Sequence, residues 1–488
     1  MNENTMPRRK PLGRHGTSGS AFSITRRSLL ASAGASAILG LPELTPSAHA
    51  QSSDALQGWL KATAIPVRTV DALDEDFSDL EPLANRIADA RVVQLGEPSH
   101  GAGTCFAAKV RLIKFLHQRK GFDVLVWESG FYDLERTEAG LRAGSDAVAA
   151  AQRGILKIWS ASEQCRPLFA YAKQSHAGSR PLIMAGFDMQ FTSDGAFAAF
   201  AAELQSYVGA LRNRSLRRRA TLAAGNAVAA FSGFNAYVDA LATGAASKPP
   251  QPRRDALEKV QHAVDRLAKL FDRHRVAFAK IGGERRRGFM AHAVANLAGY
   301  AANTFEQFGA DVPARSDAEL VRENRRDALN AQNLRWLIEE GYPGRKIIVW
   351  AHNVHVMNAY YGSDWKSINL DPTPNTMKPT GVFLAEWLGK AVYTIGCTAY
   401  EGKDGWVGSP GSAIAPARDG GIEARLHQLG FAYAFLDLRA ARSTLNHPLR
   451  LLQTMRIPKY DEVEIADATR PYDAIFYVAR MEPATMIR

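Results

Sequence analysis

Cysteine is scarce in this sequence of 488 residues, and long apolar runs are missing from it. The three cysteines, Cys105, Cys165 and Cys397, are widely separated and form no C-x-x-C pair. This pattern excludes a disulfide scaffold and gives no support for a cysteine zinc site. A membrane-spanning helix needs about 20 predominantly apolar residues in a row. We therefore expect no stable membrane association.

The sequence also lacks a large excess of charge of one sign. The 60 Lys and Arg residues stand against 49 Asp and Glu residues, which gives a formal net charge of +11. Part of that excess lies in the first fifty residues, and the remainder is too small to indicate a nucleic-acid partner. With 46% hydrophobic and 22% charged residues, the composition is that of a globular protein and excludes a disordered chain.

Several standard catalytic signatures are missing as well. The sequence holds no G-x-S-x-G, no H-E-x-x-H, no P-loop and no complete dinucleotide fingerprint. The segment 97–101, Glu-Pro-Ser-His-Gly, resembles a nucleophile elbow but lacks the first glycine. Ser99 directly precedes His100, so the two are badly placed to form a nucleophile–base pair. We predict neither a cofactor nor a resident metal.

The first fifty residues have the pattern of an export signal. The pair Arg26-Arg27 precedes a weakly apolar run from Leu29 to Leu41, and Ala48-His49-Ala50 has the form of a cleavage site. These features in this order predict a twin-arginine signal over residues 1–50. We expect recognition by the twin-arginine export machinery and a periplasmic or secreted mature protein. The alternative is a disordered basic tail followed by a short core helix.

Short, continuously apolar runs recur along the rest of the chain, separated by helical patterns. Runs of this kind are typical of strands that are buried on both faces. Their alternation with helices predicts an α/β fold with a mostly parallel central sheet flanked by helices. The predicted strands are residues 91–95, 123–127, 181–185, 346–350, 391–395, 432–436 and 474–478.

The stretch from about residue 196 to 335 interrupts this alternation. It is rich in Ala and Arg and contains no convincing strand. Leu257, Val260, Val264, Leu267 and Phe271 follow one another at helical spacing. We interpret the stretch as a helical insertion in a single catalytic domain that covers residues 51–488.

Acidic and imidazole side chains follow several of the predicted strands. In α/β sheets, ligands bind beyond the carboxyl ends of the strands, and a carboxylate beside an imidazole can raise its basicity. Taken singly, His352 could be a satisfied buried histidine and Glu128 a helix cap. Taken together, the residues predict one catalytic cleft built from Glu97, His100, Glu128, Asp188, His352 and His355.

A series of motifs in the chain resembles the erythromycin esterase family, over roughly residues 70 to 480. The motifs are Gly96–Gly101, Trp127–Gly130, Trp159 with Glu163, Gly186–Gln190, Arg326-Asp327 with Asn333 and Trp336, and Ala351–His355. The resemblance implies an α/β fold with helical additions. It also implies a hydrolase that opens macrolide lactones without a covalent intermediate.

The resemblance further implies roles for individual residues. His100 would activate water, Glu97 and Glu128 would orient it and the surrounding cations, and His352 and His355 would complete the pocket. Where the family usually carries Arg, this chain has Lys109, followed by Arg111 at a second basic position. Lys cannot make the planar two-pronged contact of Arg. We predict that Lys109, Arg111 and Asp188 bind the substrate or its oxyanion.

The sequence leaves two other classes of function open. Glu97, His100, Glu128, His352 and His355 also have the chemistry of zinc or iron ligands, although no two of them share an established metal motif. A non-catalytic binding protein could use the same cleft. The preferred prediction is a metal-independent hydrolase of a small-molecule ester or lactone, with macrolides among the candidate substrates.

Overall fold

The computed structural model describes residues 46–243, 254–308, 315–363, 366–452, 454–456 and 460–487. The twin-arginine pair and the apolar run lie outside these residues, whereas Ala48-His49-Ala50 lies in helix α1 (Pro46–Thr63). The chain divides into two units, Met1–Ala48 and His49–Arg488. The sheets, the helices beyond α1 and the cavity described below belong to the second unit.

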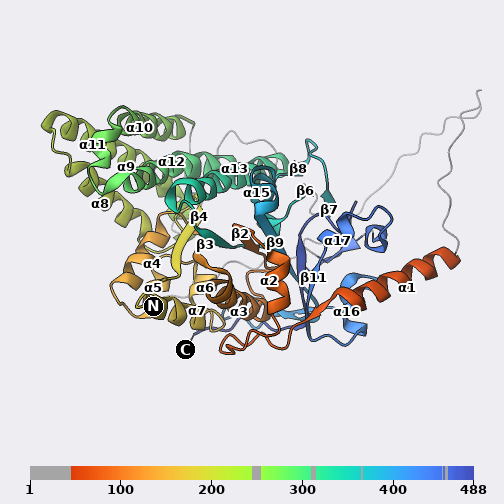
Figure 1. Ribbon diagram of the computed structural model, residues 1–488. Helices are drawn as coiled ribbons and strands as arrows, with labels where there is room; N and C mark the ends of the chain where they lie inside the picture. The colour runs from red at the N-terminus through yellow and green to blue at the C-terminus, as the bar shows by residue number, and fades with distance from the viewer. Residues whose placement is uncertain are drawn as a thin grey trace, which may run out of the picture. The chain divides into compact units, whose positions relative to one another are not determined.

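A mostly parallel sheet forms the centre of this unit, as the apolar runs predict (Figure 1). Its strand order is β1-β11-β14-β9-β2-β5-β3-β4, with β10 paired to β9. The strands from β14 to β4 along this order are parallel, and β1, β11 and β10 pair antiparallel. Their bounds are β1 Ile65–Pro66, β2 Val92–Leu95, β3 Phe122–Gly130, β4 Ile183–Asp188, β5 Lys346–Trp350, β9 Val392–Asp404, β10 Ser412–Ile414, β11 Tyr433–Asp437 and β14 Ala474–Met481.

Helices cover both faces of this sheet, which is why its strands are apolar without interruption. Val92 of β2 packs into one hydrophobic cluster and Val93 into the other, because successive side chains of a strand point to opposite faces. On the Val93 face lie α2 Glu81–Ile87, α3 Gly103–Lys120, α4 Asp133–Arg142, α5 Ala147–Gln152, α6 Lys157–Ser160 and α7 Arg166–Ser175. Short helices α15 Thr380–Leu388 and α16 Ile422–Gln428 contribute to the Val92 face.

The described residues between β4 and β5 form helices and no strand. These are α8 Ala196–Gly209, α9 Arg214–Thr243, α10 Arg254–Arg273, α11 Arg275–Ala279, α12 Gly283–Phe308, α13 Arg315–Trp336 and the π-helical turn η1 Leu337–Gly341. In α10 the apolar positions predicted at helical spacing, Leu257 to Phe271, are buried. Helix α13 leads the chain back to the central sheet and packs against β4 (Figure 1).

A second, smaller sheet has the order β12-β13-β7-β6-β8. Its strands are β6 Tyr360–Gly362, β7 Ser367–Asn369, β8 Thr376–Met377, β12 Thr454–Met455 and β13 Val463–Ile465. The remaining short elements are α14 Asn353–Val356, α17 Arg439–Arg442, η2 Gly389–Ala391 and η3 Pro448–Leu451. None of the helices in the described ranges combines the length and the apolar character that crossing a bilayer requires.

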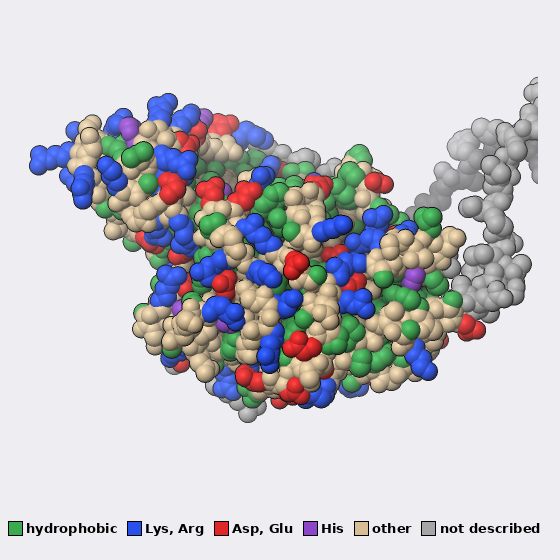
Figure 2. All heavy atoms as spheres, in the orientation of Figure 1, with side chains coloured by type: hydrophobic (Ala, Val, Ile, Leu, Met, Phe, Trp, Pro, Cys, Tyr) green, Lys and Arg blue, Asp and Glu red, His purple; other side chains and the backbone are tan. Residues whose placement is uncertain are grey.

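Charged side chains of both signs are interspersed on the face shown in Figure 2. Lys and Arg gather most densely over the helices α8 to α11, where Asp and Glu side chains lie among them. On this face the two signs are mixed, in keeping with a composition of 60 Lys and Arg residues against 49 Asp and Glu residues.

Candidate active site

The predicted cleft residues come together because their strands are neighbours in the sheet. Strands β2, β5, β3 and β4 are consecutive and parallel, so their carboxyl ends meet at one edge. Glu97 and His100 follow β2, and His352 and His355 follow β5. Glu128 and Asp188 lie at the ends of β3 and β4. The register of β3 shifts between Trp127 and Gly130, and such a bulge re-aims the side chains within it.

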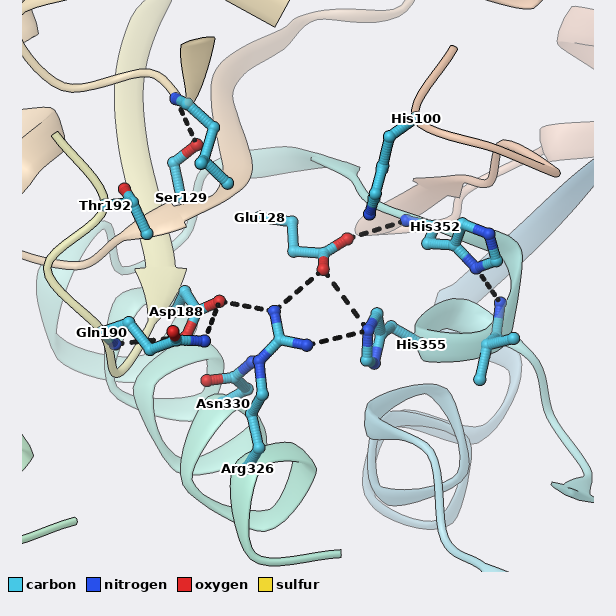
Figure 3. Close-up of polar contacts among 12 residues, drawn as sticks. His100, Glu128, Ser129, Asp188, Gln190, Thr192, Arg326, Asn330, His352 and His355 are labelled. Carbon is cyan, nitrogen blue, oxygen red and sulfur yellow. Dashed lines mark hydrogen bonds and ion pairs between the residues drawn. The ribbon is translucent and has the colours of Figure 1, made fainter. Parts of the chain in front are cut away.

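His100 is held by the carboxylate of Glu97. The Nδ1 atom of His100 lies 3.0 Å from Oε1 of Glu97, so Nδ1 carries the proton and Nε2 keeps its lone pair. The imidazole is 25% exposed, and no described residue hydrogen-bonds to Nε2. Figure 3 shows His100 pointing toward Glu128 from the side opposite Arg326. This orientation and tautomer are what a general base requires.

Glu97 is itself fully buried and fixed by two donors. Nζ of Lys109 lies 2.7 Å from Oε2, and the indole Nε1 of Trp159 donates to Oε1 over 2.9 Å. The Lys109 ammonium also lies 4.1 Å from the ring centre of Trp350. Lys109 is therefore buried behind Glu97 and does not line the cavity. Its position corrects the prediction that Lys109 contacts the oxyanion: it acts on Glu97 instead.

Arg111 lies outside the site altogether. Its guanidinium group forms a two-pronged contact with Asp79, at 2.7 and 3.0 Å, and donates to the carbonyl oxygens of Thr69 and Asp76. These contacts tie α3 to the segment that precedes α2. The predicted oxyanion role of Arg111 is wrong, because its side chain is committed on a face of α3 away from the cavity.

Glu128 is the centre of a charged cluster (Figure 3). Its Oε1 lies 3.0 Å from Nη2 of Arg326 and 3.3 Å from Nε2 of His355, and its Oε2 accepts from the backbone N–H of His352 over 2.9 Å. Burial raises the pKa of Glu128, but the neighbouring His355 and Arg326 outweigh this effect and hold the pKa well below its usual range. Glu128 is therefore a permanent anion.

His355 is clamped between two carboxylates. Its Nδ1 lies 3.0 Å from Oδ1 of Asp327, which also accepts hydrogen bonds from the backbone and the hydroxyl group of Thr380. Burial lowers the pKa of His355, but Asp327 and Glu128 outweigh that effect and raise the pKa to about 9. At neutral pH, His355 is therefore an imidazolium on the cavity wall.

His352 has both ring nitrogens engaged. Its Nδ1 accepts from the backbone N–H of Val354 over 3.1 Å, so Nε2 carries the proton and donates to the carbonyl of Pro98 over 3.1 Å. The ring lies 5.2 Å from that of His100, centre to centre. His352 has no lone pair to offer to water, and its contacts instead connect the loop after β5 to the loop after β2.

Arg326 is the main residue of the site that strand-end reasoning missed. It lies in the middle of α13, so the positions of the strands do not predict that its side chain reaches the carboxyl edge of the sheet. Its Nη2 bonds Oδ2 of Asp188 at 2.6 Å as well as Glu128, and its Nη1 lies 3.3 Å from Nε2 of His355. Asp188 is buried behind it and does not line the cavity, so Asp188 holds Arg326 instead of contacting substrate.

A cavity of about 730 Å³ opens over these groups. His100, Arg326, His352 and His355 line one part of it. The other part is contributed by the end of β9, by β10 and by the segment around residue 460. The aromatic ring of Trp406, which is 59% exposed, lies 6.0 Å from His100. The residues lining this part include Asp404, Trp406, Ser412, Ile414, Arg456, Tyr460 and Asp461.

Two glycines let the walls approach one another. A Cβ atom on Gly96 would lie 2.2 Å from Oδ1 of Asn353, and one on Gly101 would lie 2.3 Å from the backbone of Gly405. Only glycine permits such contacts. Gly96 thus lets the loop after β2 pack against the loop after β5. Gly101 lets the same loop after β2 pack against the end of β9.

The described ranges contain no cluster of side chains that matches the alternative prediction of a metal site. No three His, Cys, Asp or Glu side chains there are grouped to hold an ion. In the structure, His352 has both ring nitrogens engaged, and Glu97 is bonded to Lys109 and Trp159.

A histidine hydrogen-bonded to a buried carboxylate lies at the carboxyl edge of the parallel sheet, which is where α/β proteins bind their ligands. The model of the family described as "Erythromycin esterase" matches residues 117–481, a range that contains Glu128, Arg326, His352 and His355. The chain belongs to the erythromycin esterase family. The resemblance inferred from the motifs is thereby confirmed, and membership supports a hydrolase.

Individual relatives agree with this assignment. The chain is 27% identical over 423 residues to a Bacillus subtilis (strain 168) protein named "Putative hydrolase YbfO", covering 82% of this chain and 85% of that protein. It is 36% identical to erythromycin esterase type II of Escherichia coli over 73 residues, 15% of this chain and 17% of that protein.

Solved structures share the fold. A Bacillus cereus protein superposes with a TM-score of 0.68 at 20% identity, covering 89% of this chain and 99% of that chain. A mutant of the erythromycin esterase EreC in its open conformation gives a TM-score of 0.61 at 17% identity, covering 86% and 98%. The α/β fold with a mostly parallel central sheet is thus confirmed.

Proposed function

We propose that the protein hydrolyses a carboxylic ester or lactone by direct attack of water, with His100 as the general base. The observation that carries this proposal is the arrangement of the imidazole. Nδ1 is fixed on the buried carboxylate of Glu97, and Nε2 faces the cavity with no partner among the described residues. A water molecule between Nε2 and a bound carbonyl carbon would lose its proton to His100 as it attacks.

Glu97 stabilises the imidazolium that this step creates. The carboxylate lies 3.0 Å from Nδ1, so positive charge that forms on the ring is met by a fixed negative charge. Lys109 and Trp159 keep the carboxylate in position. Neither has to move during the reaction, and such preorganisation lowers the cost of charge formation.

Arg326 and His355 supply the positive charge for the oxyanion. Both line the cavity, and both are held in place by carboxylates: Arg326 by Asp188 and Glu128, and His355 by Asp327. Cations fixed before the reaction stabilise a developing oxyanion at no reorganisation cost. In this scheme they take the role that the sequence assigned to Lys109 and Arg111.

Ser99 lines the same cavity but is not the nucleophile in this scheme. Its Oγ accepts a hydrogen bond from the backbone N–H of Gly101 over 3.1 Å. The Nδ1 atom of His100 is taken by Glu97, and no contact joins Ser99 to Nε2. The serine–histidine pair that acyl-enzyme formation needs is absent from these contacts.

The family and the size of the cavity support the proposed substrate class. A volume of about 730 Å³ is within the usual range for small-molecule sites, and the similar proteins include erythromycin esterases. We therefore include macrolide lactones among the candidate substrates. From the sequence of residues 1–50 we also propose export by the twin-arginine machinery and a periplasmic or secreted location.

The proposal is tested by incubating purified protein with a panel of lactones and esters and detecting hydrolysed products by mass spectrometry. We expect wild type and His262→Ala, which changes an exposed histidine on α10, to produce the same hydroxy acid or acid–alcohol pair. The His100→Ala protein should lose that product. Equal product from His100→Ala and wild type would contradict the proposal.

A further inference from the structure

A half-buried carboxyl group lines the cavity near the His100 loop and has no role in the proposed reaction so far. Asp404 is the last residue of β9 and lines the cavity. The backbones of Gly101 and Gly405 are in contact, so the end of β9 packs directly against the loop that carries His100. Asp404 and the proposed base are therefore held on one wall by two glycines.

One oxygen of Asp404 has no hydrogen-bond partner. Its Oδ1 is buried, and nothing in the described part of the chain bonds to it. The carboxyl group also forms no ion pair with a described Lys, Arg or His. A buried polar atom without a partner is costly, so bound water, a ligand group or a proton on the carboxyl group has to compensate for it.

The surroundings of Asp404 stabilise its neutral, protonated form, so its pKa is higher than that of an ordinary aspartate. Burial raises the pKa of Asp404, and hydrogen bonds from Ser99 and the Gly405 backbone only partly oppose this. Glu97 disfavours a second negative charge, whereas His100 favours it. The nearby Tyr460 is neutral, because burial raises the pKa of its hydroxyl group far above the usual value.

Arg456 lines the same part of the cavity but does not neutralise Asp404. Its guanidinium group donates to the backbone carbonyls of Ala399, Tyr400, Ala415 and Tyr460. A cation committed to carbonyl oxygens forms no pair with the carboxyl group. Asp404 thus combines a half-buried position on the cavity wall with one unpartnered oxygen.

We infer that Asp404 is the general acid that protonates the leaving alcohol. The inference rests on the proposed ester or lactone hydrolysis. Attack forms the bond between water oxygen and the carbonyl carbon, and His100 receives one proton of that water. When the tetrahedral intermediate collapses, the bond to the leaving oxygen breaks, and that oxygen takes the proton of Asp404. His100 then returns its proton, through solvent, to the Asp404 carboxylate, so that both groups are reset.

The test compares two esters of the same acid that differ only in the leaving group. An alkyl alcohol is a poor leaving group and needs a proton, whereas p-nitrophenolate leaves without one. We expect Asp404→Asn to lower kcat on the alkyl ester by about 10²-fold and to change kcat on the p-nitrophenyl ester by less than about threefold. Asp404→Glu should recover part of the alkyl-ester activity. Glu401→Gln, an amide substitution of a half-buried glutamate on the same strand that pairs with Arg480 and does not line the cavity, is the matched control.

The outcomes separate this inference from the proposed function. Equal losses on both esters would overturn the inference, because a general acid acts selectively on poor leaving groups. Unchanged alkyl-ester turnover would overturn it too, and would make His100 the proton donor. If wild type hydrolyses neither ester, or if His100→Ala equals wild type on both, the proposed function fails and the inference fails with it. A steeper dependence of kcat on leaving-group acidity in Asp404→Asn than in wild type would support it.

Discussion

His355 and Asp327 form a buried pair in which Nδ1 lies 3.0 Å from Oδ1, and this pair sets the charge of the cavity wall beside Glu128. The hydroxyl and backbone N–H of Thr380 bond the same oxygen of Asp327 and hold the carboxylate still. The consequence is an imidazolium that persists through neutral pH. In the proposed reaction, Arg326 and His355 are the two cations on this wall that would face the oxyanion.

The pH dependence of activity tests this pair. Because the pKa of His355 is raised to about 9, kcat should fall as the pH rises through about 9 and the imidazolium loses its proton. Asp327→Asn removes a charge that raises this pKa, so the descending limb should move to lower pH. A pH–rate profile of both proteins measures the shift. Superimposable descending limbs would contradict the assigned role of Asp327.

The same group links pH to stability. A histidine whose pKa is raised on folding stabilises the native state fully below its unfolded pKa, about 6.5. That contribution is lost as the pH rises through about 9. The free energy of unfolding of wild type should therefore decrease between these values more than that of His355→Asn. Urea denaturation at several pH values measures this, and parallel pH profiles would refute the linkage.

Arg326 should be far less replaceable than its neighbour Arg325. Lys at position 326 can keep one of the contacts to Asp188 and Glu128 but not the guanidinium fork. We expect Arg326→Lys to lower kcat by about 10²–10³-fold, the usual cost of losing an oxyanion donor. Arg325 pairs with Glu306 on a neighbouring helix, so Arg325→Lys is the control. Similar kcat values for the two variants would remove Arg326 from the mechanism.

Substitutions of Lys109 and Arg111 are predicted to have different effects on kcat. Both are buried cations of α3, so Lys109→Met and Arg111→Met should each lower the free energy of unfolding, by about 3–5 kcal/mol for a broken buried pair. Only Lys109→Met should also lower kcat of the folded protein, because Lys109 holds Glu97. Kinetics below the unfolding transition separate the two effects. A kcat loss in Arg111→Met alone would restore its predicted role at the site.

Export is tested independently of catalysis. Replacing Arg26 and Arg27 together by Lys should leave the protein in the cytoplasm with residues 1–50 uncleaved, because the twin-arginine pair is what the machinery recognises. Cell fractionation and N-terminal sequencing report the result. Normal export with Gln51 as the first residue would refute this route.

The parts of the site that follow strands could be predicted from the sequence. Glu97, His100, Glu128 and the two histidines after β5 could be predicted because the carboxyl ends of parallel strands share an edge. Arg326 and Asp327 could not be placed in this way, since they lie within a helix whose packing on β4 depends on long-range contacts. The sequence signal for these two residues was the Arg326-Asp327 motif, which is one of those that resemble the erythromycin esterase family.

The errors at Lys109 and Arg111 have a related cause. Both follow the catalytic motif closely in sequence, but α3 turns their side chains toward Glu97 and toward Asp79. Sequence proximity to His100 does not reveal which helix face meets the cavity. The wall formed by Asp404 and Trp406 was missed because it depends on the contact between Gly101 and Gly405.

The most direct test of the central claim is the turnover of His100→Ala as a function of added imidazole. The side chain of His100 is 25% exposed at the cavity, so imidazole can enter the space that the substitution creates. A general base should be worth about 10²–10⁴-fold in kcat. The account predicts that loss without imidazole and a recovery that rises with imidazole concentration. Turnover by His100→Ala that equals wild type without imidazole would contradict it.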